Sequence, residues 1–180
     1  MALTSTIYTF DIQLSDMDRN VYETLDVRAA MHPSESAEFM VTRLLAYCCE
    51  YAEGIEFSKG ISTPDEPPVF VRDLTGRTRV WIDIGMPDAA RIHRASKAAD
   101  RVVIYTHRDP KQLLAQWAGE RIHKAEDVEL YAVDRALVDA LAAKLERRMQ
   151  IGVTVTDRHL YLALGDEMID GALTRHPLPQ

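Results

Sequence analysis

The chain has 180 residues, 47% of them hydrophobic and 27% charged, which is the composition of an ordinary globular protein. Its formal net charge of −7 argues against broad, charge-driven binding of nucleic acid, although it leaves room for a local basic groove. No stretch approaches the roughly 18–20 apolar residues of a membrane span, and the first six residues lack the basic start and long apolar run of a signal peptide.

The length is that of one domain, so we expect a single domain over 1–180. Its two cysteines, Cys48 and Cys49, are neighbours inside a helical pattern, where adjacent side chains diverge. A structural disulfide is therefore not expected, and a reducing compartment fits this cysteine usage. We expect a cytoplasmic protein without a membrane association.

The first third of the chain predicts a hairpin followed by a core helix. Apolar and polar residues alternate over 7–14 and again over 21–29, with a turn at 16–20 between them. A helix opens at 33–35 with Ser34 as its N-cap, and its apolar positions keep helical spacing until Gly54 ends it.

The remaining chain alternates strands and helices after a loop at 56–68. The expected elements are strands 69–71 and 79–84, a helix from about 87 to 99, strand 102–105, helix 110–119, strand 128–133, helix 134–149 and a hairpin of 151–155 with 159–164. The polar tail 171–180 is expected to be loosely held. This order predicts an α/β (α+β) fold, in which a mixed sheet is flanked by helices and extended by an N-terminal and a C-terminal hairpin.

The strand 79–84 contains an acidic residue, Asp83, that needs a partner for its charge. Asp83 stands between Trp81, Ile82 and Ile84, which indicate that the strand is largely buried. A lone buried charge is too costly, so the Asp83 carboxylate is expected to be paired with an arginine or bound to a cation.

Further acids and bases accompany Asp83. Glu38 lies in the first helix, and Asp65 with Glu66 lies in the loop before the buried strand. Mg²⁺ is usually held by one or two carboxylates together with water and substrate phosphates. The helix after Asp83 carries Arg91 and Arg94, three positions apart on one face and suited to hold a phosphate, and Lys97 one turn further on.

The spacing of these residues has the outline of a nuclease motif. Pro64-Asp65, then seventeen residues, then Asp83-Ile84-Gly85 follows the PD-(D/E)xK pattern, except that Gly85 stands where the pattern has lysine. In some members of that superfamily the lysine migrates to a neighbouring helix, which leaves open whether Arg94 or Lys97 replaces it.

Short sequence motifs along nearly the full chain make a resemblance to a known family specific. These motifs lie at residues 1–3, 18–20, 32–35, 43–46, 65–67, 81–88 and 91–95, together with Glu38 and Met40. They resemble the YaeQ family of small bacterial proteins, which is similar in fold to PD-(D/E)xK nucleases and whose activity is unsettled. The resemblance implies a Mg²⁺ site with Glu38, Asp65 and Asp83 as ligands. Relatives often have Glu at position 83 and Lys at position 94, and arginine at 94 can clamp a phosphate but cannot act as a general base.

Several structural alternatives stay open at this point. Asp83 pairs with Arg91, Arg94 or Arg43 in a network without metal, because ion-pair networks imitate active sites. Glu38 lies at a solvated helix edge or pairs with Arg43, and the segment 65–67 is a simple turn. Asp73 is expected to serve as a turn residue.

Two functions follow from these residues. The first is a metal-dependent nuclease or phosphodiesterase that acts on or binds nucleic acid, with Glu38, Asp65, Asp83 and Arg94 as catalytic residues and with Arg91 and Arg94 holding the phosphate. The second is a nuclease-like fold without catalysis, which serves as a binding or regulatory module with a protein partner, in transcription for example. The missing lysine and the net charge favour the second.

Overall fold

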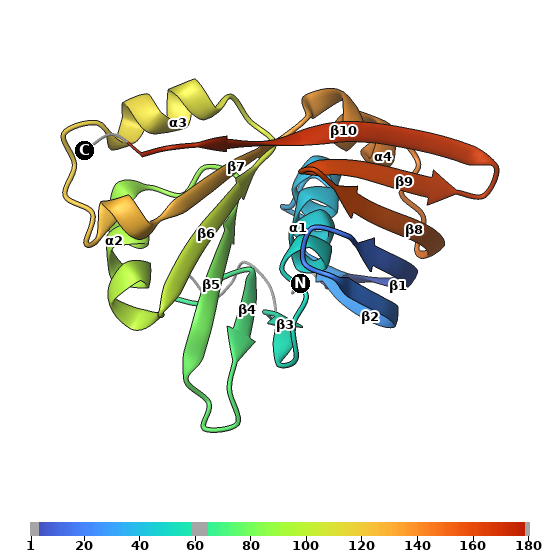
Figure 1. The fold of residues 1–180 in the computed structure, drawn as a ribbon, viewed down its shortest axis with the longest axis horizontal. Helices are drawn as coiled ribbons and strands as arrows, with labels where there is room; N and C mark the ends of the chain where they lie inside the picture. The colour runs from blue at the N-terminus through green and yellow to red at the C-terminus, as the bar shows by residue number, and fades with distance from the viewer. Residues whose placement is uncertain (1–3, 59–64, 179–180) are drawn as a thin grey trace.

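The computed structural model describes residues 4–58 and 65–178, and within these ranges the strands form one ten-stranded mixed sheet (Figure 1). The strand order is β2-β1-β8-β9-β10-β7-β6-β5-β4-β3, in which β1 with β8, β5 with β6 and β6 with β7 are parallel pairs. The strands are β1 Thr6–Asp16, β2 Val21–Met31, β3 Ile55–Phe57, β4 Val69–Arg72, β5 Thr78–Ile84, β6 Arg101–Thr106, β7 Glu129–Val133, β8 Arg148–Thr156, β9 His159–Leu164 and β10 Glu167–His176. The helices are α1 Ala37–Cys49, α2 Ala89–Ala98, α3 Pro110–Trp117 and α4 Arg135–Ala143, with a short 3₁₀ turn, η1, at Ala125–Asp127. The predicted mixed sheet flanked by helices is therefore confirmed.

Helix α1 is the centre of the larger core. It lies between the two halves of the sheet in Figure 1, and its residues from Met40 to Ala46 are all buried. The predicted helix is confirmed, but its predicted start is wrong, because the N-cap is Ser36 and not Ser34. The Ser36 hydroxyl oxygen accepts a hydrogen bond from the amide of Phe39 at 3.1 Å, which satisfies one of the donors that every helix N-terminus leaves open.

The two faces of the β5–β6–β7 region belong to different cores. On β5 the side chains of Ile82 and Ile84 join the core around α1, whereas Trp81 joins a second core formed with α2 and α3. Successive side chains of a strand point to opposite faces of its sheet. Asp83 accordingly lies on the face that α2 covers, together with Trp81.

The expectation of a loosely held tail is wrong for most of its residues. Residues 171–176 belong to β10, which pairs with β9 through its first part and with β7 through Leu173 to His176. This strand joins the two halves of the sheet (Figure 1). A loosely held tail was expected because residues 174–180 are mostly polar or proline. Gly171 and Leu173 are nevertheless buried. Residues 179 and 180 lie outside the described residues.

Two further boundaries differ from expectation. The helix predicted over 134–149 ends at Ala143, and Arg148 already begins β8, because a strand paired in parallel with β1 competes for these residues. Part of the predicted loop 56–68 forms the short strand β3, and its residues 59–64 lie outside the described residues.

The contact between β10 and α4 requires a glycine at position 171. A Cβ atom added there would lie 2.7 Å from Asp134 Cβ and 2.8 Å from Leu137 Cβ, and both atoms are fixed by the backbone of α4 and its cap. Gly171→Ala should therefore lower the free energy of unfolding by about 1–3 kcal/mol, as overpacking usually does. Urea denaturation measures this loss. The control is Thr174→Ala at an exposed site on the same strand, and equal midpoints for the two variants would contradict the packing described.

Candidate functional site

Asp83 has an arginine as its partner. The Arg91 Nε atom donates to Asp83 Oδ2 at 2.7 Å, and the indole nitrogen of Trp81 donates to the same oxygen at 3.2 Å. The side chain of Asp83 is 4% exposed and that of Arg91 is 19% exposed. Burial raises the pKa of Asp83, while the charge and the hydrogen bond of Arg91 lower it. Of the alternatives weighed from sequence, the ion pair of Asp83 with Arg91 is the one that the structure contains.

The loop with the predicted acids lies beside this ion pair. Arg91 Nη2 donates to the backbone carbonyl of Glu66 at 2.8 Å, so the guanidinium joins α2, β5 and the loop. Asp65 is exposed in that loop. Pro64, the first residue of the predicted PD motif, lies outside the described residues. The structure therefore brings the backbone of Glu66 next to the ion pair of Asp83 with Arg91.

Glu38 does not share this location. It stands in the first turn of α1, which covers the face of the sheet opposite to Asp83. Within residues 4–58 and 65–178, no three His, Cys, Asp or Glu side chains are grouped so that they could hold a metal ion. Mg²⁺ binding by Glu38, Asp65 and Asp83 therefore stays a prediction.

The two candidates for the missing lysine are also separate from Asp83. Arg94 is exposed on α2 and forms no ion pair with the described part of the chain. Lys97 lies in the last turn of α2 and lines a cavity with Arg77, which precedes β5, whereas Asp83 lies near the other end of that strand. The hydrogen bonds that Asp83 accepts within the described residues come from Arg91, Trp81 and Ile84, and the replacement of the lysine by Arg94 or Lys97 stays a prediction.

A pocket of about 310 Å³ opens where β5 and β6 end and α1 begins. We call it the edge pocket, and its lining residues are Ser34, Glu35, Ser36, Phe39, Gly85, Met86, His107 and Arg108. Its position is one where α/β proteins often bind ligands, outside the carboxyl ends of parallel strands. The first amides of α1 have no acceptor within the helix, although Ser36 caps that of Phe39, and the helix dipole places partial positive charge at this end of the pocket.

Gly85 and His107 form the sheet side of the edge pocket. Gly85 has a φ of +83°, and a Cβ atom at this position would meet Phe39 at 3.6 Å and His107 Cε1 at 3.8 Å. His107 is 8% exposed, and its Nδ1 atom is buried without a hydrogen-bond partner among the described residues. We infer that the neutral ring carries its proton on Nε2, because a buried lone pair is better tolerated than a buried unpaired N–H.

The electrostatic surroundings of His107 are mixed. Burial lowers its pKa, and the charges of Arg135 and Arg108 lower it further, while Glu38 and Asp139 act in the opposite direction. The ring is therefore neutral near neutral pH and can donate one hydrogen bond to an anion. His107 and Arg108 thus supply hydrogen-bond donors to the lining of the pocket, next to the N-terminus of α1.

A buried ion pair supports the N-terminal side of the edge pocket. Arg43 Nη2 lies 3.8 Å from Glu35 Oε2, and the same nitrogen donates to the carbonyl of Ala30 at 2.6 Å. Both side chains are 1% exposed. Burial lowers the pKa of Arg43, and Glu35 raises it. The positive charge of Arg43 compensates the charge of Glu35. The Glu35 carboxylate therefore repels an anion in the pocket less than an unpaired carboxylate would.

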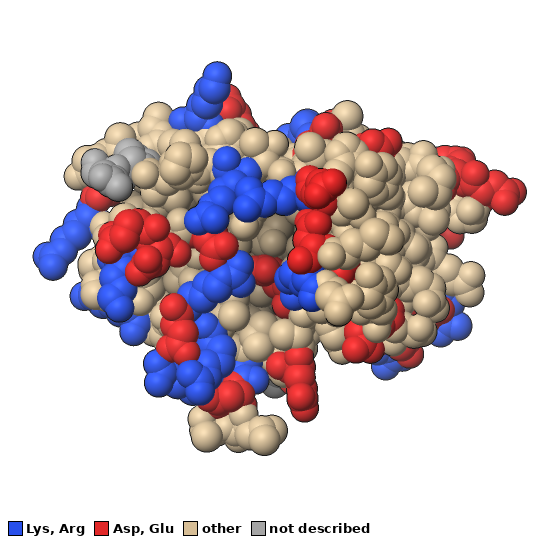
Figure 2. All heavy atoms as spheres, in the orientation of Figure 1, with Lys and Arg blue, Asp and Glu red and all other residues tan. Residues whose placement is uncertain are grey.

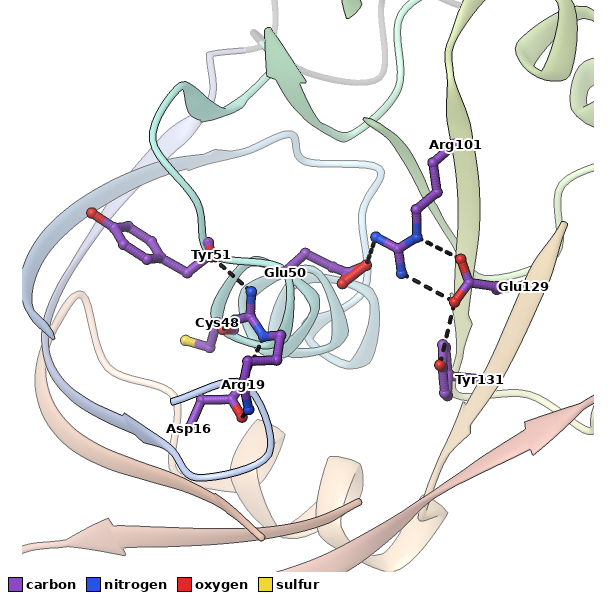
Figure 3. A network of polar contacts seen from close by, with 8 residues as sticks. All are labelled: Asp16, Arg19, Cys48, Glu50, Tyr51, Arg101, Glu129 and Tyr131. Carbon is purple, nitrogen blue, oxygen red and sulfur yellow. Dashed lines mark hydrogen bonds and ion pairs between the residues drawn. The ribbon is translucent and has the colours of Figure 1, made fainter. Parts of the chain in front are cut away.

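A second polar network lies at the other end of α1 (Figure 3). Arg101 Nη1 lies 2.7 Å from Glu50 Oε1, and Arg101 Nε donates to Glu129 Oε2 at 2.5 Å. The hydroxyl of Tyr131 donates to Glu129 at 3.4 Å. Burial raises the pKa of Glu50, while Arg101 lowers it. One arginine therefore holds two carboxylates, which is a structural arrangement rather than a vacant binding site.

Comparison with known proteins agrees with this fold. The family described as YaeQ protein matches residues 1–172. The chain belongs to the YaeQ family. Among its relatives, "Uncharacterized protein YaeQ" of Escherichia coli (strain K12) and that of Salmonella typhi are each 28% identical to it over 180 residues, which cover 99% of this chain and 99% of each relative.

Solved YaeQ structures share the architecture. The crystal structure of the YaeQ protein from Xanthomonas axonopodis pv. citri superposes with a TM-score of 0.89 at 28% identity, covering 98% of this chain and 100% of that one. The YaeQ protein from Pseudomonas syringae gives 0.86 at 28% identity, with 95% of both chains covered. No helix in the described part of this YaeQ family member is long and apolar enough to cross a membrane.

Sequence reasoning missed the edge pocket. It named Gly85 as the place of a missing lysine and assigned no role to His107. The available signal was positional: Gly85 and His107 each follow a strand of parallel type, and such strand ends converge at one edge of a sheet.

Proposed function

We propose that this YaeQ family member binds a phosphate-bearing ligand at the edge pocket and does not cleave it. The observation that carries the proposal is His107, a nearly buried imidazole that lines a pocket at the N-terminus of α1 and whose protonated Nε2 atom can donate to an anion. Helix N-termini bind phosphate because their amides point at the ligand and the helix dipole favours negative charge. Arg108 adds a full positive charge.

The remaining lining suits an ester rather than a free inorganic ion. Phe39 and Met86 supply apolar surface, and Ser34 and Ser36 supply hydroxyl groups. The volume of the edge pocket, about 310 Å³, lies at the lower end of the range for small-molecule sites. A single nucleotide, free or at the end of a nucleic-acid strand, combines the required phosphate with a ring that can pack on apolar side chains.

The proposal keeps the non-catalytic alternative of the nuclease-like fold. Asp83 is engaged by Arg91 and Trp81, and Glu38 stands on the other face of the sheet. A two-carboxylate metal site for hydrolysis would need both acids around one ion. We therefore expect no turnover of a phosphodiester such as bis(p-nitrophenyl) phosphate with Mg²⁺ or Mn²⁺. Metal-dependent cleavage that Glu38→Ala or Asp83→Ala abolishes, in folded protein, would overturn the proposal.

His107→Ala should weaken the binding of a nucleoside monophosphate about 10- to 100-fold, because a hydrogen bond to a charged group is worth about 1.5–3 kcal/mol. Isothermal titration calorimetry measures the affinity. His159→Ala on β9 removes a histidine outside the edge pocket and is the matched control. Equal affinities for the His107 variant and the wild type would contradict the proposed site.

The binding of sulfate should depend on pH in a defined direction. Sulfate stays divalent across the titration of histidine, so a pH effect reports on the protein. The pKa of His107 is lowered in the free protein, first by burial and then by Arg135 and Arg108, and an anion beside the ring raises it. Affinity should therefore increase as the pH falls through the pKa of the sulfate-bound ring. An NMR titration of the His107 ring with and without sulfate measures both values, and identical values would contradict contact with the anion.

A further inference from the structure

The turn between β8 and β9 holds an arginine in a backbone conformation that favours glycine. Asp157 and Arg158 are the two loop residues between the paired Thr156 and His159, and their φ angles are +52° and +56°. Two-residue hairpin turns of this kind prefer Asn-Gly or Asp-Gly. A non-glycine residue with positive φ is uncommon, and such residues cluster at functional sites.

The surrounding residues fix this conformation. The carboxylate of Asp18 accepts the amide of Asp157 at 2.7 Å and the amide of Arg158 at 2.9 Å. The carbonyl of Arg158 accepts the amide of Leu173 at 2.7 Å. Three hydrogen bonds thus hold the backbone, while the Arg158 side chain forms no ion pair within residues 4–58 and 65–178.

Arg158 and a second arginine line one cavity of about 420 Å³. We call it the arginine pocket, and its lining residues are Glu126, Val128, Arg158, Arg175, Pro177 and Leu178. Arg175 lies on β10 opposite Tyr131 of β7 and likewise forms no ion pair with the described residues. On the face of the molecule that Figure 2 shows, Lys and Arg side chains gather over the region of β5, β6, β7 and β10, with Asp and Glu between them.

The charges of both arginines lower the pKa of one tyrosine, Tyr131. Burial raises the pKa of Tyr131, and Glu129 raises it further, while Arg175 and Arg158 both lower it. Both arginines line the arginine pocket, and this shared lining places them at one site. Glu126 contributes one negative charge to the lining, and the apolar wall consists of Val128, Pro177 and Leu178.

We propose that the arginine pocket binds a phosphate monoester that carries a compact apolar body. Two guanidinium forks match the oxygens of a phosphate and neutralise its two charges, which lysines or a single arginine would do less well. The apolar wall would cover the organic part of the ester. This site shares no lining residue with the edge pocket and does not rest on the function proposed above.

Phenyl phosphate is the probe, and NMR titration of the backbone amides is the measurement. We expect amide shifts at Val128, Arg158 and Arg175 that saturate, and a dissociation constant several-fold lower than that of inorganic phosphate because of the apolar wall. Phenylacetate, with the same ring and a single charge, should bind at least about tenfold more weakly. Saturating shifts confined to Gly85, Phe39 and His107 would place the anion in the edge pocket and overturn this proposal.

Two variants test the arginines while keeping the fold. Arg158→Gly should retain or increase stability, because glycine adopts the positive φ without strain, and should weaken phenyl phosphate binding about tenfold or more. Arg175→Gln should weaken it similarly, whereas Arg28→Gln, at an exposed site on β2, should leave it unchanged. Unchanged affinity in both pocket variants, or equal binding of phenylacetate, would overturn the proposal.

Discussion

Arg91→Ala should lower the free energy of unfolding at neutral pH by about 3–5 kcal/mol, because it leaves the carboxylate of Asp83 buried without its partner. Arg91 also donates to the carbonyl of Glu66 at 2.8 Å, so the loop before β4 loses an anchor as well. The double variant Asp83→Asn with Arg91→Met removes both charges and should recover most of the loss. Chemical denaturation measures all three proteins.

The pH dependence of this loss has a definite sign. Burial already raises the pKa of Asp83, and removing Arg91 raises it further because the guanidinium lowers it in the wild type. A raised pKa in the folded state favours folding at low pH, and this advantage disappears as the pH rises through the folded value. The Arg91→Ala loss should thus be larger at about pH 8 than at about pH 4. A loss that is the same at both would mean that Asp83 is not the group left unpaired.

Arg101→Ala should destabilise the protein by about 2–3 kcal/mol, the next largest effect after that of Arg91→Ala. The substitution removes the guanidinium that pairs with both Glu50 and Glu129, so the two carboxylates lose their common partner and repel each other (Figure 3). The Glu50 side chain is only 7% exposed, but Arg101 is 39% exposed, so water replaces part of the lost interaction and the effect stays below that of a fully buried pair.

Glu50 also sets the pH dependence of the Arg101 variant. Its pKa is raised by burial and lowered by Arg101, so the loss should shrink as the pH falls and Glu50 becomes protonated. Glu50→Gln combined with Arg101→Ala should recover stability at neutral pH. If the double variant is as unstable as Arg101→Ala alone, the ion pair with Glu50 is not the source of the loss. Thermal unfolding at two pH values distinguishes these outcomes.

The sequence predicted helices and strands correctly where the periodicity of its apolar residues was clear. It failed where pairing between distant strands decides the secondary structure. The alternation of the first hairpin and the spacing of α1 correspond to β1, β2 and α1. Strand β10 was missed because its pairing with β7 joins segments that are distant in the chain, although β9 directly precedes it, and because half of its residues are polar or charged. The end of α4 was misplaced because β8 pairs with β1, a contact that no local pattern reveals.

The candidate site was predicted only in part for a related reason. A buried Asp83 that needs a partner could be derived from its neighbours, and the ion pair with Arg91 was among the expected partners. The face to which each side chain points could not be derived, because it depends on which side of the sheet α1 and α2 pack. That choice separates Glu38 from Asp83 and places the N-terminus of α1 beside His107.

We propose the edge pocket as the ligand site and assign a structural role to the ion pair of Asp83 with Arg91. The most direct test compares the affinity for a nucleoside monophosphate of His107→Ala with that of the charge-free double variant Asp83→Asn with Arg91→Met, by calorimetry on folded protein. We predict a loss of about 10- to 100-fold for His107→Ala and less than about twofold for the double variant. The reverse order, with binding lost in the double variant and retained in His107→Ala, would contradict the claim.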